Sequence, residues 1–524
     1  MKKILNNKTV KILLLILIGT TFLFETPYDP DFGWHYKYGE YFFQNGKLLK
    51  ENIFSYTYPD YEWVSSYWIP QILIYISYHF LGNTVPAFLA SLIFSVILFL
   101  LLKNYSNDLF SISFVFLLII ISLKSFVITV RPLYFSTLFL FLLMSILLKK
   151  NSNKKYIPLI FLIWANTHAD FLLGLFVLGV YCTDNFLKIT SAPSPNFKKI
   201  TSPFKNRVYL TTYFNSLKKY FGELIKNKNT ASILVNNFWI LAASIVATLI
   251  NPYGFKLWAV LIKELNQPFR SFVREWLPPQ NINFLSSISN IFISMGLIFS
   301  ILPYKNTNEE HRWNRFIIIF FYILGIKSVY FSRISIISAS FLVLKNIEMI
   351  KKDVSPIIKN KFKNIPSFTP TVFLLFLSGF TTNVFVNNFF LSLNLKEWSV
   401  KKNYPYEAVS YIKSNPIEGN MLNDYSWGGY LIWQLPEYKT FIDGRMTAWR
   451  DDKKYLMEDY QKIFGDTDKN KALLDEYVES YDIGWILSRP DSNVIKFLKE
   501  NRSNEWEIVF EDGVSTILRK MKRA

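Results

Sequence analysis

From Ile12 to Phe390 the chain alternates long apolar segments with short polar connections. Several of these segments, with their flanks, reach the roughly 18 apolar residues that a helix needs to cross a bilayer. The pattern predicts a polytopic membrane protein with eleven spanning helices. The predicted spans are Ile12–Phe24, Val85–Leu102, Leu109–Val127, Leu133–Leu148, Tyr156–Ala165, Phe171–Leu187, Phe238–Ile250, Phe284–Leu302, Phe316–Tyr330, Ile334–Leu344 and Pro370–Phe390.

The positions of the lysines predict the orientation of these spans. No small-residue cleavage site follows Phe24, so the first span is expected to be an uncleaved signal anchor. Trp68–Leu81 is apolar enough to span, but if it did, the basic segments that follow would face outward. Cytoplasmic loops are enriched in Lys and Arg, so we predict that Trp68–Leu81 lies along the interface. The N-terminus is then cytoplasmic and the C-terminus extracytoplasmic. The basic segments are Lys149–Lys155, Lys188–Lys228 and Lys345–Lys363.

After Phe390 the composition becomes that of a soluble domain. Helical and strand patterns alternate there, which predicts a small α/β sandwich. We expect a helical membrane domain over 1–393, with a large first extracytoplasmic loop (25–84) and a basic cytoplasmic loop (188–235), and an extracytoplasmic α/β domain over 394–524. The expected helices are Tyr406–Lys413, Lys453–Ile463, Lys471–Tyr481 and Asn493–Glu500, and the expected strands are Met421–Asn423, Thr440–Asp443, Ile483–Ser488, Trp506–Phe510 and Val514–Arg519.

Composition agrees with a membrane protein. The 524 residues are 51% hydrophobic and 18% aromatic. A net charge of +19 could indicate a nucleic-acid partner, but most of the charge lies in loops between apolar segments, so we expect the lipid bilayer as partner and no nucleic acid. The single cysteine, Cys182, excludes an intramolecular disulfide.

Ionisable residues gather on the predicted outer face. Asp29-Pro30-Asp31-Phe32-Gly33-Trp34-His35 directly follows the first span, and ionisable groups at a membrane edge indicate function. Each residue alone has an ordinary explanation, because loops end helices at proline turns and an arginine at a helix end usually snorkels. Together they predict a functional site. The other members are Arg131, Asn166, His168, Asp170, Asn251-Pro252-Tyr253-Gly254, Glu275 and Arg333.

These motifs resemble the GT-C-fold glycosyltransferases. The first-loop segment is similar to that of the oligosaccharyltransferase catalytic subunit, and the Trp68-Ile69-Pro70-Gln71 helix resembles one in protein mannosyltransferases. Ser271-Phe272-Val273-Arg274-Glu275 resembles their late-loop motif. The closest likeness is to a group of bacterial GT-C-like membrane proteins, which carry the first-loop acids, Trp-x-Asn-x-His and a C-terminal Trp-Gly-Gly-Tyr followed by Phe-Ile-Asp-Gly-Arg. The chain departs from oligosaccharyltransferases in two places: the Trp-Trp-Asp-Tyr-Gly core is not intact, and Arg131-Pro132 replaces the second-loop acids.

The resemblance implies transfer of a sugar from a polyprenyl-phosphate-linked donor at the outer face of a bacterial plasma membrane. It implies no nucleotide cofactor, because the donor is lipid-linked. A divalent cation, Mg or Mn, is the expected cofactor, with Asp31 and Asp170 as its ligands. The implied catalytic residues are Asp29, Asp31, His35 and Glu275, the donor-phosphate contacts are Arg131 and Arg333, and the substrate or acceptor contacts are Asn166, His168, Asp170, Trp427, Tyr430, Asp443 and Arg445.

Two other classes stay open on the residues alone. The same outward polar groups could serve a transporter or flippase for lipid-linked glycans, or a non-catalytic assembly protein for them. A transporter is expected to have polar residues at the middle of the membrane and broken helices in two corresponding halves. This sequence has polar residues at one face and no second half, which favours the transferase.

Overall fold

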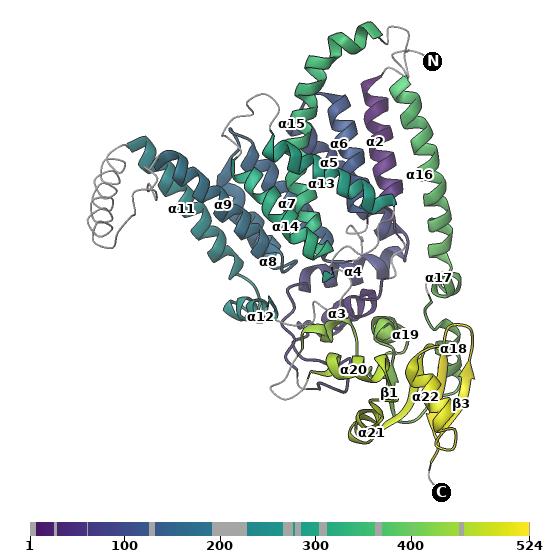
Figure 1. Cartoon of the computed structure of the whole chain (residues 1–524). Coiled ribbons are helices and arrows are strands. Elements are labelled where there is room, and N and C mark those ends of the chain that lie inside the picture. Colours follow the sequence, from purple (N-terminus) through teal and green to yellow (C-terminus); the bar gives the residue numbers. More distant parts are fainter. Residues whose placement is uncertain are drawn as a thin grey trace, which may run out of the picture.

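The computed structural model describes residues 7–25, 29–59, 61–124, 131–190, 228–265, 276–277, 284–302, 312–361, 369–401, 403–449 and 455–522. Helices form a bundle at one end of the molecule, and a small domain with a sheet lies at the other end (Figure 1). Helices α3 (Phe32–Asn45), α4 (Trp68–Leu81) and the amphipathic α12 (Phe255–Leu265) lie between the two parts. The segment 191–227 of the predicted basic loop lies outside the described residues.

Helices cover all eleven apolar segments that the sequence predicts to span. Three of the described helices are long and apolar enough to cross a membrane, over Val85–Tyr105, Phe171–Lys188 and Pro370–Leu393. The count of eleven spans therefore stays a prediction. The helices are α2 (Lys8–Leu23), α5 (Val85–Tyr105), α6 (Leu109–Leu123), α7 (Leu133–Leu148), α8 (Ile157–Ala165), α9 (Phe171–Thr190), α11 (Lys228–Thr248), α13 (Phe284–Ile301), α14 (Arg312–Lys327), α15 (Val329–Lys361) and α16 (Thr369–Leu393).

The boundary between the ninth and tenth predicted spans differs from the prediction. Helix α14 ends at Lys327, and α15 begins at Val329 and continues through the basic segment to Lys361. Lysine and glutamate have long, unbranched side chains and favour the helical conformation. Glu348 and Lys352 lie four residues apart on one helix face and form an ion pair at 2.9 Å. A strongly basic segment thus prolongs a helix here instead of ending it.

The first loop folds into two helices that pack on each other, α3 (Phe32–Asn45) and α4 (Trp68–Leu81). Gly39 makes this packing possible, because a Cβ atom there would lie 2.3 Å from the Gln71 carbonyl oxygen. Helix α3 ends at Gly46, whose φ of 63° suits glycine. Helix α4 lies crosswise at the base of the bundle (Figure 1).

The C-terminal domain holds a four-stranded sheet in the order β1-β2-β4-β3, with β1 and β2 parallel and the other pairs antiparallel. This confirms the predicted α/β character. The strands are β1 (Asn420–Asn423), β2 (Ile483–Ser488), β3 (Trp506–Glu511) and β4 (Thr516–Lys520), and the helices are α17 (Leu395–Lys401), α18 (Tyr406–Ser414), α19 (Gly428–Gln434), α20 (Leu456–Gly465), α21 (Lys471–Ser480) and α22 (Asn493–Asn501).

One predicted strand is wrong. Thr440–Asp443 is no strand of this sheet; Thr440 makes an isolated bridge with Ser55 of the first loop, and the chain then turns into the 3-10 helix η7 (Gly444–Ala448). The apolar residues Phe441 and Ile442 are fully buried. Their burial serves contact between the domain and the first loop, which a pattern of apolar residues cannot distinguish from a sheet strand.

Candidate active site

The first-loop acids meet Arg131 at the end of the bundle. The guanidinium of Arg131 donates from Nε to the Asp29 carboxylate at 2.9 Å. Its Nη2 atom lies 3.6 Å from the Asp31 carboxylate. The backbone N–H of Asp31 donates to the Asp29 carboxylate at 3.0 Å, which fixes the turn before α3. The Asp31 side chain keeps 27% exposure and that of Asp29 only 7%. The structure therefore brings together three of the predicted site residues and leaves Asp31 the more accessible acid.

His35 lies one helical turn after Asp31, on the buried side of α3. Its ring contacts Trp34 with ring centroids 3.6 Å apart and keeps 3% exposure. Burial, with the nearby charge of Arg131, lowers the pKa of His35 well below its ordinary value. Its Nδ1 atom has no hydrogen-bond partner among the described residues. His35 is thus a neutral imidazole placed directly behind the acids.

The C-terminal domain covers this turn through glycines. A Cβ at Gly429 would lie 1.9 Å from the Pro30 carbonyl oxygen, and one at Gly33 would lie 1.8 Å from the Gly429 carbonyl oxygen. A Cβ at Gly444 would lie 2.5 Å from the Asp31 carboxylate. Only residues without a side chain permit backbones to approach this closely. The Gly-Gly motif therefore touches the turn that carries the two acids.

A second ion pair lies deeper, where three helices of the bundle meet. Asp170 accepts hydrogen bonds from Arg333 and Tyr330, and Arg333 also donates to Thr137 at 3.3 Å. The Arg333 side chain is 2% exposed. Burial opposes ionisation of Asp170, but Arg333 and Tyr330 outweigh it, so the pKa of Asp170 lies below its ordinary value. We call Asp170, Arg333 and Tyr330 the inner cluster.

His168 and Asn166 connect the inner cluster to the first loop. Nδ1 of His168 accepts from the Asp170 backbone N–H at 3.1 Å, and burial lowers the pKa of His168 to about 4, so this imidazole is neutral. Asn166 accepts from the Trp68 indole at 3.0 Å and donates to the Ile250 carbonyl at 2.9 Å. The predicted Trp-Ala-Asn-Thr-His-Ala-Asp motif thus joins α4 to the bundle.

The predicted residues of the C-terminal domain lie inside it. Trp427 and Tyr430 are buried, and the Trp427 indole donates to the Asn403 carbonyl at 2.9 Å. Asp443 and Arg445 form a buried pair at 2.7 Å, and Arg445 also donates to Asn52 of the first loop at 3.1 Å. The Arg445 guanidinium lies over the Trp63 ring, 4.8 Å from its centroid. This pair holds the domain to the first loop.

Three residues near the site were not predicted from the sequence. Tyr330 donates a hydrogen bond to Asp170. The Tyr67 ring lies between two histidines, with its centroid 6.0 Å from that of His35 and 5.3 Å from that of His168. Glu264 is an acid on the amphipathic α12. Burial raises the pKa of Glu264 to about 7. A single carboxylate in the apolar segment Leu257–Leu265 was the available signal for Glu264. The tyrosines gave none, because the chain holds 31 of them.

The described residues contain no group of three or more His, Cys, Asp and Glu side chains that could hold a metal ion. Glu275 lies outside the described residues, as does most of its loop. Arg131 supplies positive charge between Asp29 and Asp31, and Asp170 is engaged by Arg333 and Tyr330. The divalent cation stays a prediction, and no step of the chemistry below passes through it.

Comparison with solved structures gives the fold. The archaeal oligosaccharyltransferase AglB from Archaeoglobus fulgidus, in complex with an inhibitory peptide and a dolichol-phosphate, is similar at a TM-score of 0.56 and 11% identity, over 92% of this chain and 69% of that one. The apo form of the Archaeoglobus fulgidus oligosaccharyltransferase is similar at a TM-score of 0.52 and 12% identity, again over 92% of this chain and 69% of that one. A form of that enzyme tethered to an acceptor peptide with the NVT sequon is similar at a TM-score of 0.53 and 11% identity, over the same fractions of the two chains.

No family model and no curated protein matches the chain. The chain thus has the GT-C-like fold of these oligosaccharyltransferases, which the first-loop motifs predict, and three of its described helices are long and apolar enough to cross a membrane.

Proposed function

We propose that the chain is a membrane glycosyltransferase that moves a sugar from a polyprenyl-phosphate-linked donor to an acceptor at the extracytoplasmic face. The observation that carries this proposal is the partly exposed Asp29–Arg131–Asp31 cluster at the end of the bundle. The similar AglB structure contains a dolichol-phosphate, which supports a lipid-linked donor here. In this arrangement the N-terminus is cytoplasmic and residues 394–524 are outside.

The chemistry follows from the three side chains. A hydroxyl or amide of the acceptor attacks the anomeric carbon of the sugar, and its proton passes to the Asp31 carboxylate, the more exposed acid. The bond between that carbon and the phosphate oxygen breaks, and the lipid phosphate leaves with the electron pair. Arg131 stabilises the departing phosphate, because a guanidinium can bind two phosphate oxygens at once. Asp29 orients Arg131 and the Asp31 backbone.

The test is a transfer assay with the purified full chain. The substrates are the polyprenyl-phosphate-linked sugars extracted from host membranes and the cell-envelope fraction, and mass spectrometry measures the free polyprenyl phosphates and the modified acceptor. We expect Asp31→Asn to lower transfer by about 10²–10⁴-fold, the usual cost of losing a general base. Arg131→Lys keeps the charge but loses the bidentate geometry, and we expect it to lower transfer as well.

Asp491→Asn is the matched control, because Asp491 is an exposed carboxylate in the C-terminal domain, in the turn before α22. It should transfer at the wild-type rate. If wild type binds the lipid-linked sugar without cleaving it, the transporter alternative replaces the transferase. If Asp29→Asn and Asp31→Asn both keep full turnover, the catalytic assignment is wrong.

A further inference from the structure

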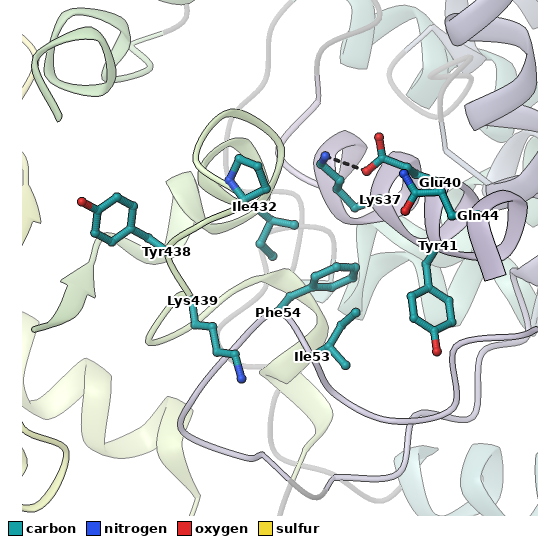
Figure 2. Close-up of a pocket in the computed structure, with 10 residues that line it drawn as sticks. Lys37, Glu40, Tyr41, Gln44, Ile53, Phe54, Ile432, Tyr438 and Lys439 are labelled. Carbon is teal, nitrogen blue, oxygen red and sulfur yellow. Dashed lines mark hydrogen bonds and ion pairs between the residues drawn. The ribbon is translucent and has the colours of Figure 1, made fainter. Parts of the chain in front are cut away.

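A cavity opens between α3, the first loop and the C-terminal domain. Its volume is about 190 Å³, and Figure 2 shows side chains of the three parts around it. We call it the seam pocket. Its lining residues are Lys37, Glu40, Tyr41, Gln44, Ile53, Phe54, Ile432, Pro436, Tyr438 and Lys439.

Helix α3 has one face at the seam pocket and its N-terminal end at the active site. Lys37, Glu40, Tyr41 and Gln44 are spaced so that they share one helix face. Asp31 lies at the N-terminal end of the same helix. Ten residues at 1.5 Å rise place Tyr41 ~15 Å along the axis from Asp31. A short oligosaccharide can span this distance.

The floor of the pocket is held rigidly. The Phe54 carbonyl accepts from the Thr440 backbone N–H at 3.0 Å, so the first loop and the C-terminal domain share a backbone contact at this point. The Arg445 guanidinium lies 5.0 Å from the centroid of the Phe54 ring. Phe54 of the first loop is therefore held by the C-terminal domain through its backbone carbonyl and its ring, and the pocket is formed by the docked domain.

The lining suits a neutral, hydroxyl-rich ring. Tyr41 and Phe54 offer aromatic surface for the apolar C–H face of a pyranose. Lysine only donates hydrogen bonds, an ionised Glu40 only accepts them, and the Gln44 amide does both, as sugar hydroxyls do. Lys37 and Glu40 are paired at 2.6 Å, so opposite charges lie side by side at the rim. Because Glu40 neutralises Lys37, the charge left in the lining is that of one exposed lysine, Lys439, which is too little to select an ionic ligand.

We propose that the seam pocket binds a neutral sugar unit of a substrate glycan, remote from the reacting carbon. This inference rests on the proposed transferase function and extends it to the glycan class that the enzyme holds. The same chemistry could come from the distal sugars of the donor or from an acceptor glycan. Binding is expected to need the docked C-terminal domain, because Ile432, Pro436 and Lys439 belong to it.

The experiment measures saccharide binding to the purified full chain by saturation-transfer-difference NMR. One probe is the oligosaccharide pool released by mild acid from polyprenyl-linked lipids of host membranes, and the other is the pool released from the cell envelope. We expect one pool to bind, which identifies the donor or the acceptor as the source. Tyr41→Ala and Lys439→Ala should each weaken that binding about tenfold.

The controls separate this proposal from the catalytic one. Phe43→Ala removes an exposed aromatic of the same helix that does not line the pocket, and Lys413→Ala removes an exposed lysine of the C-terminal domain. Both should bind as wild type does. Asp31→Asn should bind the saccharide yet fail to transfer sugar. If neither pool binds, or if Tyr41→Ala and Lys439→Ala bind as wild type does, the seam pocket is no saccharide site, whatever the transfer assay shows.

Discussion

Two of the Asp–Arg clusters among the described residues, the first-loop cluster and the inner cluster, differ in their surroundings. In the first-loop cluster, Arg131 keeps 21% exposure and lies 3.6 Å from Asp31. In the inner cluster, Arg333 keeps 2% exposure, and Asp170 is bound by both Arg333 and Tyr330. An accessible ion pair can exchange a partner for a substrate, whereas a buried pair that also binds Tyr330 and Thr137 fixes the helices around it. Burial therefore separates the chemical cluster from the structural one.

The largest expected effect is on transfer by the first-loop cluster. Asp31→Asn and Asp29→Asn should each lower the transfer rate by about 10²–10⁴-fold and leave the melting temperature within a few degrees of wild type. The reason is that Asn matches Asp in size, so neither change opens a cavity, and Arg131 keeps 21% exposure, so water can solvate its charge when one carboxylate is lost. Paired measurement of turnover and melting temperature in detergent checks this. A large fall in melting temperature for both variants would make this cluster structural like the inner one.

The inner cluster should respond in the opposite way. Asp170→Asn leaves the buried Arg333 charge without its carboxylate, and breaking a buried pair costs about 3–5 kcal/mol. We expect poor yield or an early melting transition. The double variant Asp170→Leu with Arg333→Leu should recover part of that loss, because it removes both charges together. If Arg333→Leu instead folds normally and loses donor binding, the sequence-based role of Arg333 as a phosphate contact is favoured.

A smaller effect tests the contact that covers the first-loop cluster. Gly429→Ala places a Cβ against the Pro30 carbonyl, so the backbone must shift, at a cost of roughly 1–3 kcal/mol. We expect reduced transfer and greater trypsin sensitivity of the first loop. Gly513→Ala is the matched control, because nothing lies within 4 Å of a Cβ built there. If Gly429→Ala and Gly513→Ala show the same transfer rate and the same trypsin sensitivity, the C-terminal domain does not position the acids.

The smallest expected effect concerns pH. The folded pKa of His168 is about 4 and its ordinary value is 6.5, so the unfolded chain takes up a proton first as the pH falls. This residue lowers stability progressively between pH 6.5 and 4, by roughly 2 kcal/mol at pH 5. When the pH is lowered from 7.5 to 5, the melting temperature should therefore fall less in His168→Asn than in wild type. Glu264, with a raised pKa, acts with the opposite sign, so the comparison uses the variant against wild type. A steeper fall in the variant would contradict a buried neutral His168.

Elements with local signals could be predicted from the amino-acid sequence. Long apolar segments predicted the bundle helices, and short strand patterns predicted all four strands of the sheet. The first-loop acids and Arg131 could be grouped because each follows an apolar segment on the same predicted face. Thr440–Asp443 was mistaken for a sheet strand, since burial by another part of the chain leaves the same apolar pattern.

The accessibility of each charge to a substrate depends on tertiary packing. Asp29 and Asp170 are both acids near helix ends, yet their partners come from residues more than a hundred positions away, Arg131 and Arg333. The amino-acid sequence does not reveal how far apart such partners lie in space. The same holds for Gly33 and Gly429, whose close approach depends on two segments meeting without side chains between them. Burial and long-range contact are properties of the packed chain, and they set the accessibility on which the chemistry depends.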